Sequence, residues 1–571
     1  MKTRAAEQPP RYAQVLRLRW PGWAGLLAWS LVLLFVAWPL LQLVLQTMTP
    51  TNAGGGFLQS YREAFSQPVA LSAVWGTLWL TALSLLLGVP LAVLLAWITS
   101  STDAPLARPL AILPTLTLAL SPLVGAIGWL VMTAPRVGSL NLMLRSLFGL
   151  NVETGPLNAY SLPMIVMLTT FYVVPYVYGP TYAAFRQVDA SLNEAARACG
   201  ASETGAAWTI ILPLLRPAIL AGALIGGVMA AAMFAIPLIL SGNTGLHVIP
   251  TEIYHYLNQE GRPAPAMALA SLLSAATIVA MVAYLRLLAR GRFVTVSGKG
   301  SRPMRVRLGV WRWPATLVLL LFLLLAMVLP LLSLLHLSLV DFWSREVFSL
   351  PLSFQQYRRM AEFPQALEGL RNSGWLSAVA ATLALALGAL LSYRRARMDN
   401  RANRVLAFVG SLPLGIPSIV IGLAFLVSFT GGWLPLYGTA LIMILAYAVH
   451  VLPIGMRNCE AGLMQMSPEL EEAGLVCGDS RRGVIIRIVA PLLRRPLVTA
   501  WGLIFIILFR DISISILLYT PATIPSSVAL LAMFDQGSMP TAAAYANLVT
   551  LISAVVVALI LLANTSEEPA R

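Results

Sequence analysis

Long apolar runs, separated by short polar stretches, fill the chain between residues 24 and 563. The runs are continuous and rich in Leu and Ala, without the strict apolar–polar alternation of a membrane β-barrel strand. About 20 apolar residues in a row are enough for a helix to cross the hydrocarbon core of a bilayer. We therefore predict twelve membrane-spanning helices, six in each half, near 24–46, 70–99, 110–133, 161–185, 218–241, 264–290, 314–340, 372–392, 405–428, 436–456, 497–519 and 541–563.

The third and ninth of these runs are the least regular, because Pro114, Pro122, Pro413 and Pro417 interrupt them. Proline is tolerated in membrane helices where neighbouring groups bond the freed carbonyls, so we keep both runs as spans. The composition agrees with a membrane setting: 58% of the 571 residues are hydrophobic and 11% are charged, whereas soluble chains have about 25% charged residues. The expected fold class is an all-α integral membrane protein.

The net charge of +15 comes largely from basic clusters that lie outside the predicted spans. One cluster precedes the first span, one joins the halves around residues 286–312 without any acidic residue, and one lies at 394–404. With twelve spans all three fall on one side, which the positive-inside rule makes cytoplasmic, together with both termini. Basic residues so placed set topology and contact anionic lipid, and they argue against nucleic-acid binding. The predicted division is a cytoplasmic segment 1–23, a first half 24–290, an Arg-rich cytoplasmic linker 291–313, a second half 314–563 and a cytoplasmic tail 564–571.

One motif occurs twice, once in each half, and both copies lie on the predicted cytoplasmic side. The two copies match at many positions with one constant separation along the chain, which chance does not explain. We therefore interpret the chain as a tandem duplication of two halves. The principal motif residues are Glu194, Ala195, Ala196, Gly200 and Pro213 in the first copy, and Glu472, Ala473, Gly478 and Pro491 in the second.

Each copy predicts a helix, a tight turn and a second helix. A capping residue, Asp189 or Ser467, precedes a short helix that carries the motif glutamate. A glycine then ends this helix as a residue that tolerates positive φ, and a second short helix begins near Ser202 or Ser480. We expect the motif proline to break the pattern before the next span. The alternative, an amphipathic loop lying on the membrane surface, is disfavoured by two copies in register on one face.

Other reactive chemistry is sparse in the sequence. Cys199 and Cys477 directly precede the two loop glycines, and we interpret both as small buried residues. Three cysteines cannot form a disulfide framework, and four scattered histidines predict no metal site. The segment Gly298-Lys299-Gly300 lacks the upstream glycine and the Ser or Thr of a phosphate-binding loop, so it predicts a flexible linker.

The pattern Glu-Ala-Ala-(x)3-Gly-(x)9-Ile-(x)-Leu-Pro resembles the signature of type I ABC importer permeases. The first copy matches it from Glu194 to Pro213, and the second departs from it at Gly474 and Ala490. The resemblance covers most of the chain from about residue 70 to 563 and implies two tandem six-helix permease halves. Segments similar to those of fused ferric-iron permeases, a group that includes thiamine and phosphonate permeases, are Phe234–Leu240, Ile249–Tyr254 and Leu508–Tyr519.

The resemblance implies a bacterial inner-membrane subunit of an ATP-driven importer. The two loops would dock a homodimeric ABC ATPase in the cytoplasm, and a substrate-loaded binding protein would dock outside. No cofactor is expected on this chain, because ATP and Mg²⁺ belong to the ATPase, and the chain itself is not expected to be an enzyme. Ferric iron is the leading substrate, with thiamine, phosphonate or another small anion as alternatives. A twelve-span secondary transporter is the alternative class, since internal repeats are common there too.

Two charged residues, Arg510 and Asp511, fall inside the predicted eleventh span. Ionisable groups at that depth are costly and face a partner or a water-filled cavity. One interpretation is a pair of structural contacts to other helices, and the other is a polar site or gate on the substrate pathway. Met233 and Phe234 occupy the corresponding region of the first half, as core packing or as a gate.

The outer side offers candidates for docking a binding protein. These are Glu252, Tyr254 and His255 between the fifth and sixth spans, and Arg358 and Arg359 between the seventh and eighth. Solvated loop residues are the alternative interpretation for each of them.

Overall fold

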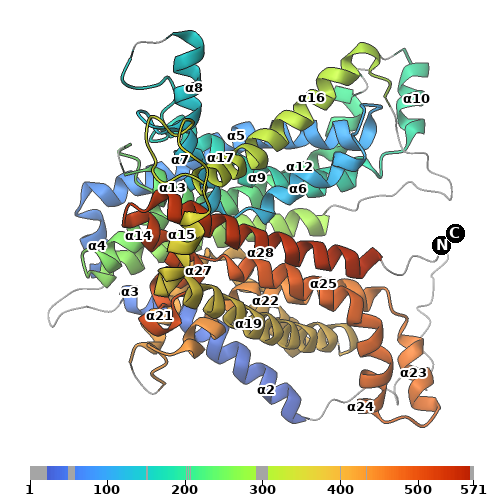
Figure 1. Cartoon of the computed structure of the whole chain (residues 1–571). Helices are drawn as coiled ribbons and strands as arrows, with labels where there is room; N and C mark the ends of the chain where they lie inside the picture. The colour runs from blue at the N-terminus through green and yellow to red at the C-terminus, as the bar shows by residue number, and fades with distance from the viewer. Residues whose placement is uncertain are drawn as a thin grey trace.

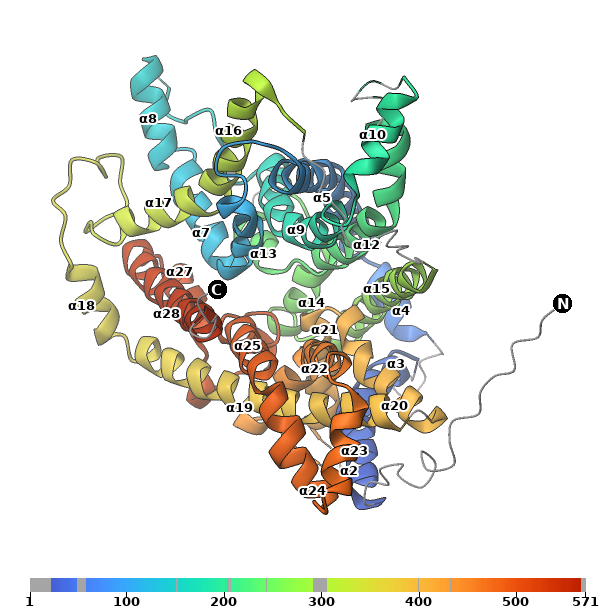
Figure 2. The same ribbon diagram turned by 90° about the vertical axis from the view of Figure 1, so that its right-hand side faces the viewer.

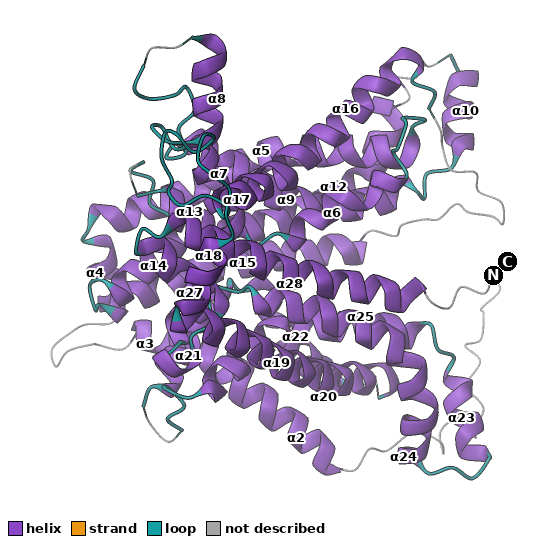
Figure 3. Cartoon of the chain, viewed as in Figure 1, coloured by secondary structure: helices purple, strands orange, loops and turns teal. Residues whose placement is uncertain are grey.

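The computed structural model describes residues 22–48, 58–149, 152–200, 202, 205, 207–242, 244–290, 306–398, 400–431 and 434–565. Within these residues the chain is helical, apart from loops and one isolated bridge between Thr102 and Val306. Figure 3 shows helices throughout both halves, as the apolar runs predict. The N-terminal basic cluster, the segment 298–300 and the last residues of the tail lie outside the described residues.

The first half contains α2 (Gly22–Val32), η1 (Leu33–Ala37), α3 (Trp38–Met48), α4 (Gln59–Phe65), α5 (Pro68–Ser101), η2 (Pro109–Ile112), α6 (Leu113–Leu116), η3 (Thr117–Ala119), α7 (Pro122–Thr133), α8 (Ser139–Phe148), α9 (Leu162–Phe185), α10 (Ala190–Ala198), η4 (Ala207–Ile211), α12 (Leu212–Ala231), α13 (Ala235–Leu240), α14 (Ile249–Asn258) and α15 (Pro263–Arg290).

The second half contains η5 (Gly309–Trp311), α16 (Arg312–Leu323), η6 (Leu324–Val328), α17 (Leu329–Leu337), α18 (Gln355–Glu362), α19 (Pro364–Arg397), α20 (Arg401–Ser411), η7 (Leu412–Gly415), α21 (Ser418–Phe429), α22 (Ala440–Met464), α23 (Pro468–Val476), α24 (Arg481–Val484), η8 (Ile485–Val489), α25 (Ala490–Phe509), α26 (Ser515–Leu518), η9 (Pro521–Thr523), α27 (Ser526–Asp535) and α28 (Met539–Thr565).

Among the described residues, ten helical segments are long and apolar enough to cross a membrane. Two further pairs of helices pass the same test together but are bent, by 94° before α7 and by 113° before α21. Counting each bent pair as one span gives the predicted twelve, and the bends fall in the two proline-interrupted runs. Ser121 and Ile416 at these bends are extended and precede prolines, which disfavour helical backbone in the residue before them.

The two halves repeat the same helix order, with one insertion. In the first half, the connection between α7 and α9 contains the additional helix α8, which Figure 1 shows projecting from the side of the bundle. The matching connection in the second half, between α21 and α22, has no helix among its described residues. The first half therefore carries an extra outer element.

The first span of each half packs against the opposite half. Helices α2 and α3 lie beside α19–α22, and α16 and α17 lie beside α5 and α7 (Figures 1 and 2). Phe35 contacts Phe429 with ring centroids 6.2 Å apart, and Phe171 contacts Phe322 edge-on at 5.9 Å. The hydroxyl of Ser333 in α17 donates to the carbonyl of Gly128 in α7 at 2.9 Å. The sequence division into halves does not reveal this exchange.

Small residues allow the long helices to approach closely. A Cβ at Gly388 of α19 would lie 2.9 Å from the backbone nitrogen of Met456 in α22, and a Cβ at Gly88 of α5 would lie 3.3 Å from Val173 in α9. Ser392 then donates a hydrogen bond to the Met456 carbonyl at 2.9 Å. Close backbone approach at small residues is the usual way that membrane helices associate. These contacts fix the ends of the helices from which the two repeated loops project.

Candidate functional site

The two repeated loops project from the same end of the bundle, as predicted. Figure 1 places α10 and α23 on the side where α2 begins and α28 ends, opposite to α4 and α14. In the second copy the Ser467 hydroxyl accepts from the Glu469 amide at 3.3 Å, and Pro468 occupies the first helical turn. In the first copy the Asp189 carboxylate accepts from the Ser191 amide at 2.9 Å. The short lever helices α10 and α23 have the same length and matched positions.

Both loop glycines have the predicted left-handed backbone, with φ of +85° at Gly200 and +87° at Gly478. At the end of α23 the amide of Gly478 donates to the Leu475 carbonyl, and the amide of Asp479 donates to the Gly474 carbonyl, both at 3.1 Å. This pair of bonds is a Schellman motif. No atom lies within 4 Å of a Cβ built at either glycine, so glycine is required here for its backbone and not for space.

The second helix of each loop runs on into the membrane, and the motif prolines do not break it. Ser202 and Ser480 accept from the amides of Gly205 and Gly483 at 3.0 Å and start this helix. The π-helical turns η4 and η8 follow, and Pro213 and Pro491 are the second residues after them, in the first turn of α12 and α25. The expected break is therefore wrong. A widened turn directly before a proline relieves the clash and the lost hydrogen bond that proline causes in a regular helix.

The exposure of side chains in the loops contradicts one expectation, the burial of the two loop cysteines. Glu194, Ala195, Glu472 and Ala473 are exposed, and Ala196 is buried. Cys199 and Cys477 are also exposed, so their interpretation as small buried residues is wrong for this chain alone. Both cysteines directly precede the glycine that ends the lever helix.

The structure explains why the second copy has glycine where the first has alanine. A Cβ at Gly474 would lie 2.6 Å from Cδ1 of Ile488 and 3.0 Å from Cγ2 of Val484. The first copy has Ala196 at this position, and its residue matching Val484 is the smaller Ala206, which lies outside the described residues. Ile488 matches Ile210 of the first copy, so the larger Val484 is the difference between the two copies that leaves less room at Gly474.

The second loop is tied to the bundle by a buried acid, which the sequence reasoning missed. Glu471 is 2% exposed and accepts from the Tyr393 hydroxyl and from Arg397 Nε, each at 2.7 Å. Both donors come from the C-terminal end of α19. Helix α5, which has the same length in the first half, has no basic residue in its last turn, so it offers no matching cation there. An extra glutamate directly before the motif glutamate is the signal that could have revealed this anchor.

Arg510 and Asp511 do not lie inside a helix, which corrects the predicted eleventh span. Helix α25 ends at Phe509, and α26 starts at Ser515. The Asp511 carboxylate accepts from the Ile514 amide at 2.8 Å, and its carbonyl accepts from the hydroxyls of Ser515 and Ser527. Such local side-chain bonds compete with helical hydrogen bonds and end the helix. The fifth span is corrected likewise, because α12 ends at Ala231, the residue that matches Phe509.

Arg510 and Asp511 therefore differ in their contacts. Asp511 is committed to the start of α26, whereas no hydrogen bond or ion pair joins the Arg510 side chain to another described residue. Arg510 Nη1 is buried without a partner in the described structure, and the residue lies within electrostatic reach of Tyr172 and Tyr176 of α9. Arg510 thus lies in a break of the second half, within electrostatic reach of the first half.

The matching break in the first half is apolar. Met233 matches Asp511 and is half-buried, and Phe234 is 2% exposed. The Phe234 ring meets Tyr254 of α14 edge-on at 5.8 Å. Phe234 therefore packs between α13 and α14, and the two breaks present different chemistry.

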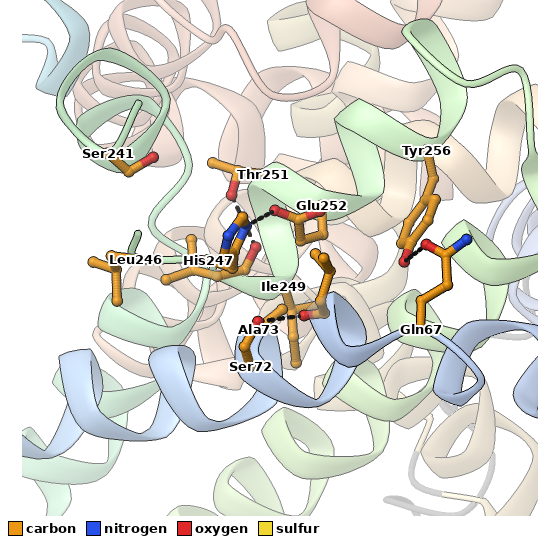
Figure 4. Close-up of polar contacts among 12 residues, drawn as sticks. Gln67, Ser72, Ala73, Ser241, Leu246, His247, Ile249, Thr251, Glu252 and Tyr256 are labelled. Carbon is orange, nitrogen blue, oxygen red and sulfur yellow. Dashed lines mark hydrogen bonds and ion pairs between the residues drawn. The ribbon is translucent and has the colours of Figure 1, made fainter. Parts of the chain in front are cut away.

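The outer docking candidates are divided between buried and exposed residues. Glu252 is buried and accepts from His247 Nδ1 at 2.8 Å, which Figure 4 shows, so it is neither exposed for docking nor a solvated loop residue. Tyr254 is half-buried, and His255 Nδ1 is buried without a partner in the described part of the chain. Arg358 and Arg359 are exposed.

Helix α14 is fixed on α5 by contacts around this pair. The amide of Ile249 donates to the Thr77 hydroxyl at 2.9 Å, and the Tyr256 hydroxyl donates to Gln67 Oε1 at 3.4 Å. A Cβ at Gly76 would overlap the His247 carbonyl oxygen, so α5 needs glycine at this crossing. The buried acid and histidine therefore support the fold, and the exposed arginines stay as the docking candidates.

Comparison with known proteins assigns the family. The model of the family described as "Binding-protein-dependent transport system inner membrane component" matches residues 88–292 and 384–566, one match in each half and more than half of the chain. The chain belongs to this family. The permease has the two-half organisation that the duplicated loop predicts, and its described residues contain no cluster of three or more His, Cys, Asp or Glu that could hold a metal.

The names of individual relatives of the permease refer to different transport systems. It is 28% identical over 387 residues to the ferric transport system permease protein FbpB of Actinobacillus pleuropneumoniae, covering 65% of this chain and 54% of that protein. It is 26% identical over 555 residues to "Probable ABC transporter permease protein y4fN" of Sinorhizobium fredii, covering 95% and 96%. It is 30% identical over 243 residues to the molybdenum transport system permease protein ModB of Mycobacterium bovis, covering 42% and 85%. The match thus spans about half the length of the ferric permease.

Proposed function

We propose that this chain is the membrane permease subunit of an ATP-driven, binding-protein-dependent importer. The observation that carries the proposal is the pair of lever helices, each ended by a glycine with φ of +85° or +87°, on one face of the bundle. Two matched, exposed turns at this end suit two matched grooves on a homodimeric ATPase. ATP and Mg²⁺ would be bound by that ATPase, and a binding protein would deliver substrate to the opposite face, where Arg358 and Arg359 are exposed.

We propose ferric iron as the first substrate to examine. Support comes from the relative named as a ferric permease and from the segments Phe234–Leu240 and Leu508–Tyr519, which are similar to those of ferric permeases. The relative named for molybdenum transport keeps a small oxyanion as the alternative. Thiamine and phosphonate are the further alternatives from the same permease group.

The docking assignment is tested by replacing both loop glycines with a bulky residue. The Gly200→Val/Gly478→Val permease should insert in the membrane but should not co-purify with its ATPase, because valine is strained at positive φ. Gly431→Val, at a position without close neighbours on a different connection, is the matched control and should keep the ATPase. Undiminished co-purification and uptake in the double variant would remove the basis of the proposal.

A further inference from the structure

The break after α25 lies where the two halves meet. Helices α12 and α25 end at matched residues, and Arg510 in the second break lies within electrostatic reach of Tyr172 and Tyr176 in α9 of the first half. Non-helical backbone at membrane depth is tolerated only where protein buries it or where it lines a water-filled cavity. Repeat transporters place their substrate sites at such interrupted helices between repeats. The position of Arg510 therefore suits a residue that substrate passes.

The bonding of Arg510 is incomplete. A guanidinium carries five N–H donors, yet no acceptor among the described residues bonds to this one, and its Nη1 is buried. The neighbouring carboxylate of Asp511 is engaged by the Ile514 amide, so it does not neutralise Arg510 by direct contact. Arg510 is only half-buried as a whole, but an unpartnered cation at membrane depth is costly, and persists where function requires it.

Two tyrosines of α9, Tyr172 and Tyr176, lie within electrostatic reach of Arg510. The Tyr172 hydroxyl is held at the first bend, where it donates to the Ser121 carbonyl at 3.1 Å and fills the space that a side chain at Gly125 would need. Tyr176, one helical turn further along α9, is half-buried. His450 occupies the position of Tyr172 in the second half, and its Nδ1 is likewise buried without a partner in the described structure.

We infer that Arg510 recognises anionic oxygen on the transported substrate at the passage between the halves. The inference rests on the proposed importer function and narrows its substrate to a species that carries negatively charged oxygen. Two sources share this chemistry: a free oxyanion, and a ferric ion crossing with anionic oxygen ligands. A guanidinium suits both, because its planar fork pairs with two oxygens at once.

The first experiment measures binding without transport. The thermal unfolding midpoint of the purified permease is recorded in phosphate and in molybdate, against sodium chloride of equal ionic strength. Wild type and Ala232→Gln, the matched position in the first half, should gain an anion-specific rise in midpoint, because a ligand that binds the folded state stabilises it. Arg510→Gln should lose this rise and Arg510→Lys should keep part of it. An equal rise in wild type and Arg510→Gln overturns the inference.

The second experiment measures ATP-driven uptake by the complex with its ATPase and binding protein in proteoliposomes. The probes are radioactive ferric iron supplied as its citrate complex, and molybdate. Arg510→Gln should reduce uptake about tenfold, the effect of losing one hydrogen bond to a charged group, while ATPase association is unchanged. Uptake of molybdate identifies a free oxyanion, and citrate-dependent uptake of iron identifies a liganded ferric ion.

A charge-restoration variant removes the ambiguity of a folding defect. In a permease with Cys199, Cys459 and Cys477 replaced by serine, Arg510→Cys should lose uptake. Reaction with aminoethyl methanethiosulfonate, which adds a cation, should restore uptake, and the sulfonatoethyl reagent, which adds an anion, should not. Equal recovery with both reagents, or wild-type uptake by Arg510→Gln, overturns the inference and leaves the importer function standing. Failure of the wild type to bind an ATPase would instead refute the importer function, and the midpoint experiment would still decide the role of Arg510.

Discussion

Removing the Glu471 carboxylate should loosen the second docking loop specifically. Glu471→Ala takes away the acceptor to which Arg397 and Tyr393 donate, and these side chains are 13% and 5% exposed. Breaking a buried ion pair from one side costs about 3–5 kcal/mol. Because Arg397 is the last residue of α19 and keeps some exposure, we expect the lower end, about 3 kcal/mol, for local opening of the loop. That is about a hundredfold rise in the open population.

Hydrogen–deuterium exchange measures this opening. Amides of α23 should exchange about a hundredfold faster in Glu471→Ala, while those of α10 in the other half should be unchanged, because opening is local. Glu472→Ala, at the exposed neighbour, should leave exchange in α23 within a few fold, since surface changes are usually within about 0.5 kcal/mol. In Glu471→Ala/Arg397→Ala the exchange should be slower than in Glu471→Ala alone, because no charge is stranded. Unchanged α23 exchange in Glu471→Ala would refute the anchor.

Three further outcomes follow from the geometry of the loop and of the break. Gly478→Ala should destabilise the lever helix by about 1 kcal/mol, because alanine is strained at positive φ although it meets no neighbouring atom. The variant should bind the ATPase more weakly in a binding titration. An unchanged affinity would mean that the turn does not contact the ATPase. Gly474→Ala should lower the thermal midpoint because its Cβ meets Ile488 and Val484, and Val484→Ala should restore part of the loss; additive losses in the double variant would contradict the compensation. Asp511→Ala should lower the midpoint more than Asp511→Asn, since an amide oxygen can still accept from the Ile514 amide; equal losses would show that this hydrogen bond contributes little.

Interactions between neighbouring residues in the sequence determined most of the backbone structure of the docking loops. A capping side chain, a short helix and a glycine that needs positive φ are properties of neighbouring residues, so Ser467 and Gly478 could be placed without a fold. Two copies in one register then determined the tandem organisation, and apolar length determined the number of spans. The same local reasoning was wrong at Pro213, because a π turn directly before the first turn of α12 absorbs the proline.

Contacts between distant segments were decided only by the tertiary structure. Glu471 and Arg397 are far apart in the chain, and nothing local distinguishes a glutamate that finds a buried arginine from its exposed neighbour Glu472. The end of α25 at Phe509 depends on the Ser527 hydroxyl reaching the Asp511 carbonyl from another helix. The exchange of the first spans between the halves is also invisible in the pattern, because an apolar helix surface suits lipid and either half equally well. Hydropathy determines that a segment enters the membrane, whereas the steric fit and the few polar contacts between helices determine which neighbours it has there.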